Sequence, residues 1–242
     1  MRQKIHLAVP PVIGTLLVAS GVVYLLHANL VMLGAESGLW IIEMLALHSF
    51  GMGSEIEGIR TGQGFAIWQV WSYALLHDPA NIGHLVYNGV FLWFFGQNVE
   101  NTWGARVFGG FVLWVVATAG LMELVAADGH VRIFGISGLV YGVMGAYLLL
   151  YGRQIVELLF VYRLPGWSIV MAFVLLEVVM LIGGGGLVGD RSVGHITHLT
   201  GFSMGVIGAA IIHGPRALKE QWMRQHRINY FGHLKRTEVG KQ

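Results

Sequence analysis

Residues 135–151 read GISGLVYGVMGAYLLLY, an apolar stretch with one hydroxyl near its start. Gly135 and Gly138 flank Ser137 and leave the backbone open to the close approach of another group. In the first turn of a helix, the free amides and the helix dipole stabilise negative charge, which the oxyanion of a nucleophilic hydrolysis requires. Helix capping is the structural alternative for such a serine. The stretch predicts a short apolar helix over 137–151 with Ser137 at its N-terminus.

The composition of the chain places this helix in a lipid bilayer. Of the 242 residues, 55% are hydrophobic and only 12% are charged, and the mean hydropathy is +0.64. A soluble domain carries about twice that share of charge. The chain has no cysteine, which excludes disulfides, thiolate metal sites and a cysteine nucleophile. A net charge of +2 is too small to suggest a nucleic-acid partner.

Apolar runs of about 20 residues, the length that crosses a bilayer, predict an all-α polytopic membrane protein. Six spans are expected, at about residues 6–33, 81–98, 106–126, 137–151, 167–182 and 195–213. Residues 1–213 would form one membrane domain. Residues 214–242 form a basic tail, most simply a surface helix held to anionic lipid headgroups.

The basic residues predict the orientation of these spans. With the N-terminus inside, twelve of the fifteen Lys and Arg residues fall in inside segments, and Arg60, Arg132 and Arg191 fall outside. Both termini are therefore expected in the cytoplasm. The first outer loop, about residues 34–80, is rich in tryptophan and phenylalanine. It reads equally as a folded loop partly embedded in the membrane interface or as an ordinary loop with an aromatic belt.

A histidine within the sixth predicted span is the natural partner of Ser137. His198 begins the sequence HLTGFSMG, in which Gly201 and Gly205 are four residues apart and share one helix face. The serine helix carries a matching pair, Gly138 and Gly142. Small residues at this spacing let two helices touch backbone to backbone. The two helices are thus expected to pack with Ser137 beside His198.

Tyr141 lies one turn below Ser137 on the same face, where it can pack against the imidazole. This arrangement permits His198 to act as a general base with no buried carboxylate in a third role.

A third polar cluster opens the second predicted span. His84 and Asn88 are four residues apart and share a helix face. Both are donors suited to an oxyanion hole. The structural alternatives are an interfacial histidine and an interhelical hydrogen bond from Asn88. Three polar clusters at one depth favour the catalytic interpretation.

The pair His195 and His198 also raises a metal site, with His84 as a third nitrogen ligand. The motif offers no nearby carboxylate except Asp190 in the preceding loop, and the chain has no HExxH sequence. No metal and no cofactor are therefore expected.

Taken together, these motifs resemble those of the rhomboid intramembrane serine proteases. The matching elements are His84-xxx-Asn88, Gly135-x-Ser137-Gly138 and His198-xx-Gly201-xxx-Gly205. Glu100 and Gly104 match the family's E-x-x-x-G at the inner end of the second span, and Tyr141 matches the tyrosine beneath the catalytic histidine.

The resemblance implies a six-helix rhomboid-like fold with a water-filled cavity that opens outward. Ser137 would be the nucleophile and His198 the general base, with His84, Asn88 and the Ser137 amide as the oxyanion hole. The substrates would be single-span membrane proteins cleaved in or near their transmembrane segments. By analogy, the chain is expected in a prokaryotic plasma membrane.

Two positions depart from the family pattern. Trp68 is followed by Gln69, where the family commonly has arginine, and this puts the anchoring of the first loop in doubt. The spacing from His77 to His84 is slightly long, so a loop role for His77 does not carry over securely.

Two other functions are alternatives to the protease. A catalytically inactive relative that binds membrane clients would usually lack the serine or the histidine. A transporter would spread ionisable residues through the whole bilayer depth. Glu123 and Glu177 lie in predicted spans without clear partners, and the sequence gives no account of Glu177.

Overall fold

A computed structural model describes residues 9–48, 55–56, 59–60, 65–126, 132–158, 162–183 and 194–239. Predictions that fall on Arg2, Lys4, residues 6–8, Arg191 and much of 49–64 lie outside the described residues.

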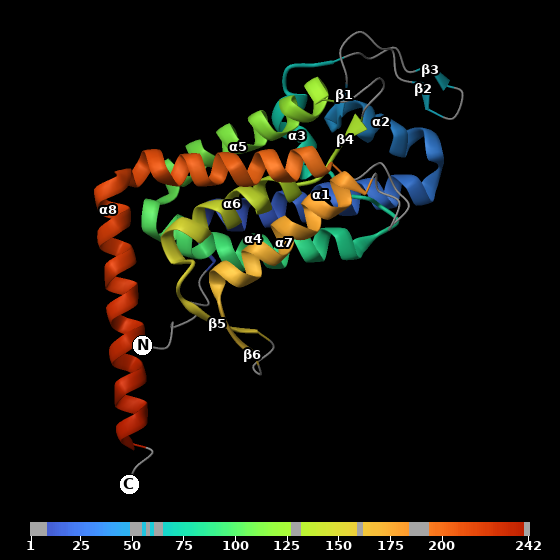
Figure 1. Ribbon diagram of the computed structural model, residues 1–242. Helices are drawn as coiled ribbons and strands as arrows, with labels where there is room; N and C mark the ends of the chain where they lie inside the picture. Colours follow the sequence, from blue (N-terminus) through green and yellow to red (C-terminus); the bar gives the residue numbers. More distant parts are fainter. Residues whose placement is uncertain are drawn as a thin grey trace.

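The described residues form mainly helices (Figure 1). The long helices are α1 (Pro11–Leu33), α4 (Ile82–Trp103), α5 (Ala105–Ala126), α6 (Ser137–Tyr151), α7 (Gly166–Ile182) and α8 (His195–Val239). Short elements of the first loop are α2 (Ala35–Leu45), β1 (Leu47–His48), β2 (Glu55–Ile56), β3 (Ile59–Arg60), α3 (Gln69–Ser72) and the 3-10 helix Tyr73–Leu75. The other strands are β4 (Arg132–Ile133), β5 (Ile155–Leu158) and β6 (Tyr162–Pro165).

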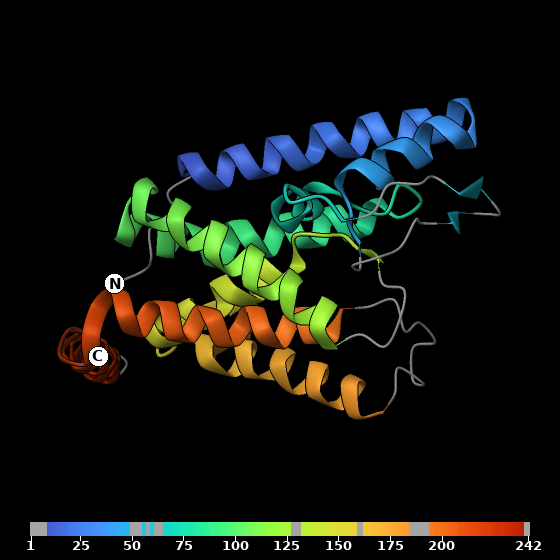
Figure 2. The ribbon, with the colours of Figure 1, turned by 90° about the horizontal axis from the view of Figure 1, so that it is seen from above.

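Helix α6 is the centre of the bundle (Figure 2). Its residues from Gly138 to Tyr147 are all buried, and it packs against α4, α5, α7 and α8. A fifteen-residue helix can occupy this place because its side chains are apolar on every face. Ser137 is the first residue of this helix, where the sequence predicted it.

Three helices are long and apolar enough to cross a membrane: Pro11–Leu33, Ala105–Ala126 and the part of α8 from His195 to Pro215. Helices α6 and α7 are shorter apolar helices. The chain is thus a mostly helical integral membrane protein, and the count of six spans stays a prediction.

The observed ends of the helices refine the predicted spans. Helix α4 continues beyond the predicted end at residue 98 to Trp103, since the Glu100 side chain has partners inside the bundle. Helix α1 begins at Pro11, a residue suited to the first turn because its missing N–H would have no helical partner.

Helix α8 extends past the predicted end at 213 and bends sharply at Gly214 (φ 68°) (Figure 1). The tail is therefore helical through Val239, and its binding to lipid headgroups stays a prediction.

The bundle has two ends, at which different helix termini meet. At the Ser137 end, α4, α6 and α8 begin; at the Trp103 end, α4 finishes and α1 begins. Strand β1 of the first loop pairs antiparallel with β4, just before Ser137, with Leu47 opposite Ile133. The first loop is thus packed onto the segment that leads to the serine.

Candidate active site

Glycines bring α6 and α8 into contact backbone to backbone. A Cβ atom on Gly201 would overlap the carbonyl oxygen of Gly138, and one on Gly205 would overlap that of Gly142. A Cβ on Gly138 itself would lie 2.7 Å from Cγ2 of Thr197. The small-residue faces predicted for these two helices are therefore in direct contact, and the approach depends on the missing side chains.

This packing places the serine and the histidine together. Nε2 of His198 lies 2.7 Å from Oγ of Ser137. The ring of Tyr141 stacks on the imidazole, with centroids 4.6 Å apart and planes at 14°. His198 is 8% exposed, so its ring is largely shielded from solvent.

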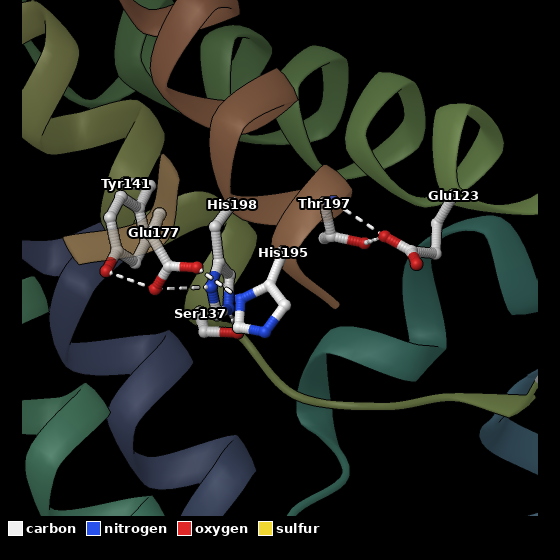
Figure 3. Close-up of polar contacts among 7 residues, drawn as sticks. All are labelled: Glu123, Ser137, Tyr141, Glu177, His195, Thr197 and His198. Atoms are coloured by element: carbon white, nitrogen blue, oxygen red, sulfur yellow. Dashed lines mark hydrogen bonds and ion pairs between the residues drawn. The ribbon is translucent and has the colours of Figure 1, made fainter. Parts of the chain in front are cut away.

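A carboxylate faces the other nitrogen, Nδ1, of the same imidazole (Figure 3). Oε1 of Glu177, on α7, lies 3.0 Å from Nδ1 of His198. This is ion-pair distance, although the Nδ1 direction is not that of a well-aligned hydrogen bond. The sequence motifs do not predict this neighbour of His198. This neighbour arises from tertiary packing, because α7 packs alongside α8 and brings Glu177 next to His198.

Glu177 has two further partners. The hydroxyl of Tyr141 donates to Oε1 over 2.7 Å, and Nδ1 of His195 lies 2.7 Å from Oε2. Glu177 is only 7% exposed. A carboxylate so buried requires several polar partners to remain ionised, and here each oxygen has at least one.

A second carboxylate supports the start of α8. Oε2 of Glu123, on α5, accepts from the backbone amide of Thr197 at 2.7 Å and from its hydroxyl at 2.8 Å. The first amides of a helix have no partner inside it, so Glu123 caps the helix one residue before His198.

The expected oxyanion donors lie at the same end of the bundle. Asn88 is 2% exposed, and its Nδ2 has no partner among the described residues. The His84 ring lies beside Gly135, whose φ of 115° favours glycine. A Cβ at Gly135 would lie 3.1 Å from Cε1 of His84 and 3.9 Å from the Ser137 hydroxyl. Gly135 thus keeps the space between these side chains open.

The two departures from the family pattern have structural roles. Gln69 is 1% exposed, donates to the carbonyl oxygen of Glu43 at 2.9 Å and accepts from the amide of Ala66 at 3.1 Å. It therefore anchors the first loop in spite of the missing arginine. His77 is buried with its ring 5.2 Å from that of His84. Burial, and next the neighbouring His84, lower the pKa of His77 to about 4.

One cluster of side chains among the described residues could bind a metal ion. Glu177, His195 and His198 offer ligand atoms that all lie within 4.8 Å of one another. This set differs from the three histidines considered on the sequence, since Glu177 takes the place of His84. The same atoms already face one another at hydrogen-bond and ion-pair distances.

Comparison with known families gives one match. The model of the Rhomboid domain matches residues 64–215. The chain belongs to the rhomboid family. The match includes all the helices that carry the site, from α4 to the bend in α8. No curated protein matches the chain.

Rhomboid membership implies membrane-protein substrates and a lipid environment. The family holds intramembrane serine proteases and inactive relatives.

Sequence reasoning missed the parts played by Glu123 and Glu177 in this rhomboid. The one available signal was the presence of carboxylates within apolar helices, which lipid tolerates poorly without partners. Three of their partners, His195, Thr197 and His198, lie in the first turn of α8, and Tyr141, which bonds Glu177, lies on α6. No periodicity in the sequence connects them.

Proposed function

We propose that this rhomboid is an intramembrane serine endopeptidase that cleaves single-span membrane proteins in or near their transmembrane segments. The observation that carries the proposal is the 2.7 Å contact between Nε2 of His198 and Oγ of Ser137. Catalytically inactive binding of membrane clients has no need of this contact.

The chemistry follows from the position of each group. Nε2 of His198 accepts the Ser137 proton as Oγ attacks the carbonyl carbon of the substrate. The tetrahedral intermediate collapses when His198 returns the proton to the leaving amine. Water then hydrolyses the resulting ester by the same path in reverse, which restores the serine.

The oxyanion of this intermediate would be held by three donors: the Asn88 amide, His84 and the Ser137 backbone amide. Nδ2 of Asn88 has no partner within the described part of the chain, which supports this role, because a preorganised donor costs nothing to reorient during the reaction. Gly135 leaves the room that a peptide carbonyl needs beside Ser137.

We further propose six spans with both termini in the cytoplasm, so that the Ser137 end opens outward in a prokaryotic plasma membrane. The excess of basic residues in the segments placed inside supports this orientation. Residues 1–213 would be the membrane domain and 214–242 a cytoplasmic tail.

Covalent labelling by a fluorophosphonate in detergent tests the mechanism. Oγ of Ser137 attacks phosphorus, fluoride leaves, and His198 takes the proton. We expect labelling and cleavage of a single-span reporter by the wild type, and neither after Ser137→Ala or His198→Ala. Ser203→Ala is the matched control, because the Ser203 hydroxyl is exposed on α8 and donates only to the carbonyl of Leu199. Proteolysis retained by Ser137→Ala would overturn the serine mechanism, and a wild type without labelling or cleavage would favour the client-binding alternative.

A further inference from the structure

Glu177 is the sole ionisable residue of α7, whose other side chains are almost all apolar. A carboxylate in such a helix is strongly unfavourable unless it is paired. Its two oxygens face Tyr141, His195 and His198, and all three of these belong to the immediate surroundings of Ser137. The carboxylate is therefore directed into the site.

The position of Glu177 relative to the imidazole has a chemical consequence. Nε2 of His198 faces the Ser137 hydroxyl, so a general base at Nε2 must carry its own proton on Nδ1. Oε1 of Glu177 lies 3.0 Å from that Nδ1. A negative charge there favours the Nδ1–H tautomer and stabilises the imidazolium that forms when Nε2 accepts the serine proton.

We infer that Glu177 is a positioning residue for His198, and that the site works as a Ser137–His198–Glu177 triad. The inference rests on the proposed serine mechanism. Because the Nδ1 direction is not well aligned with Oε1, the carboxylate acts on His198 mainly through its charge. His195, bonded to Oε2, and Tyr141, bonded to Oε1, hold that carboxylate in place.

The groups that face His198 from each packed element favour this assignment. They are Ser137 and Tyr141 from α6, Glu177 from α7, His84 from α4, and His195 on α8 itself. Among these described groups, Glu177 is the one that carries a negative charge. Glu123 also lies near the start of α8, but its carboxylate is engaged by Thr197.

Glu177→Gln removes the charge at nearly constant shape, and Glu123→Gln makes the same change at a carboxylate that does not face the imidazole. The measurement is the rate of fluorophosphonate labelling at Ser137 against pH, with a chelator present because Glu177, His195 and His198 can ligate a metal ion. For Glu177→Gln we expect the maximal rate to fall on the order of 10²-fold or more. The acidic limb of this pH profile, where the labelling rate falls with falling pH, should move to lower pH. The reason is that an imidazole without a neighbouring anion is harder to protonate. Glu123→Gln should keep the wild-type limb.

An unchanged rate and limb in Glu177→Gln, with the wild type labelled normally, would overturn the triad and leave the serine mechanism standing. No labelling of the wild type would overturn both. If Glu177→Gln does not fold, Tyr141→Phe decides the question. This change removes the hydroxyl bonded to Oε1 and keeps the ring stacked on His198. The freed carboxylate should attract a proton to His198 more strongly, so the acidic limb should move to higher pH; an unmoved limb would overturn the inference.

Discussion

The two ends of the bundle each bury a carboxylate, and the two carboxylates bind different kinds of partner. At the Trp103 end, Glu100 accepts from the backbone amides of Val12 and Ile13 at 2.8 and 3.0 Å. At the Ser137 end, Glu177 faces two imidazoles and a phenol. Backbone amides cannot serve as an acid or a base, whereas an imidazole can.

The difference separates stability from chemistry in this rhomboid. Glu100 caps the first turn of α1 and attaches that helix to α4, a task that is the same at every pH where the carboxylate is ionised. Glu177 instead shares a proton-exchanging cluster with the serine. Substitutions at the Trp103 end are therefore expected to change thermal stability and leave the pH profile of labelling alone.

The largest stability effect is expected for Glu100→Ala. It leaves the amides of Val12 and Ile13 without an acceptor, and Ile13 is fully buried. A buried donor left unpaired costs about 1–3 kcal/mol, so the free energy of unfolding should fall by about 2–4 kcal/mol. Thermal unfolding in detergent measures the loss.

The labelling profile completes the test of Glu100. Protein that remains folded should show the wild-type acidic limb, since Glu100 has no contact with His198. A shifted limb in Glu100→Ala would contradict the separation of the two ends.

The same contrast explains how much the sequence could predict. The contact of α6 with α8 was predictable because the spacing of small residues within a helix indicates close packing. The pairs are Gly138 with Gly142 and Gly201 with Gly205. That one contact brings Ser137 to His198. The ends of α5 and α6 were also predicted well, since apolar runs end where polar residues begin.

Glu177 could not be placed in this way. Its partners lie on α6 and α8, and its role depends on how α7 lies against both helices. No spacing within α7 records that geometry. The same holds for Gln69, whose partner Glu43 lies in another part of the first loop, and for the extension of α4 to Trp103.

A smaller, pH-dependent effect is expected from His77 in the loop at the Ser137 end. Burial lowers its pKa from 6.5 to about 4. At pH values between these two, the unfolded chain takes up a proton on His77 that the folded protein does not. The contribution of neutral His77 to the free energy of unfolding is therefore complete above pH 6.5 and is lost as the pH falls toward 4. The slope for one such group is at most about 1.4 kcal/mol per pH unit.

His77→Gln removes this titration. Thermal midpoints measured from pH 7 down to pH 4 should fall less steeply in the variant than in the wild type. Parallel curves for the two proteins would show that His77 takes up its proton in the folded state as readily as in the unfolded one, which would contradict its assignment as a buried neutral histidine.

The smallest effect is expected at the Trp103 end, where two helix ends are joined by one hydrogen bond. Nε1 of Trp103, on α4, donates to Nε2 of His213, on α8, over 2.7 Å. Trp103→Phe removes the donor and keeps an aromatic ring against Phe111, whose ring is 5.0 Å away. A neutral hydrogen bond contributes about 0.5–1.5 kcal/mol, so the thermal midpoint should drop slightly.

A double-mutant cycle with His213→Leu separates the bond from the loss of packing. If the bond contributes, the double variant should be more stable than the sum of the two single losses predicts, by about 0.5–1.5 kcal/mol. Strict additivity would mean that Trp103 stabilises this end by packing alone. In either case the acidic limb of labelling should stay where the wild type has it, because neither ring contacts the cluster around His198.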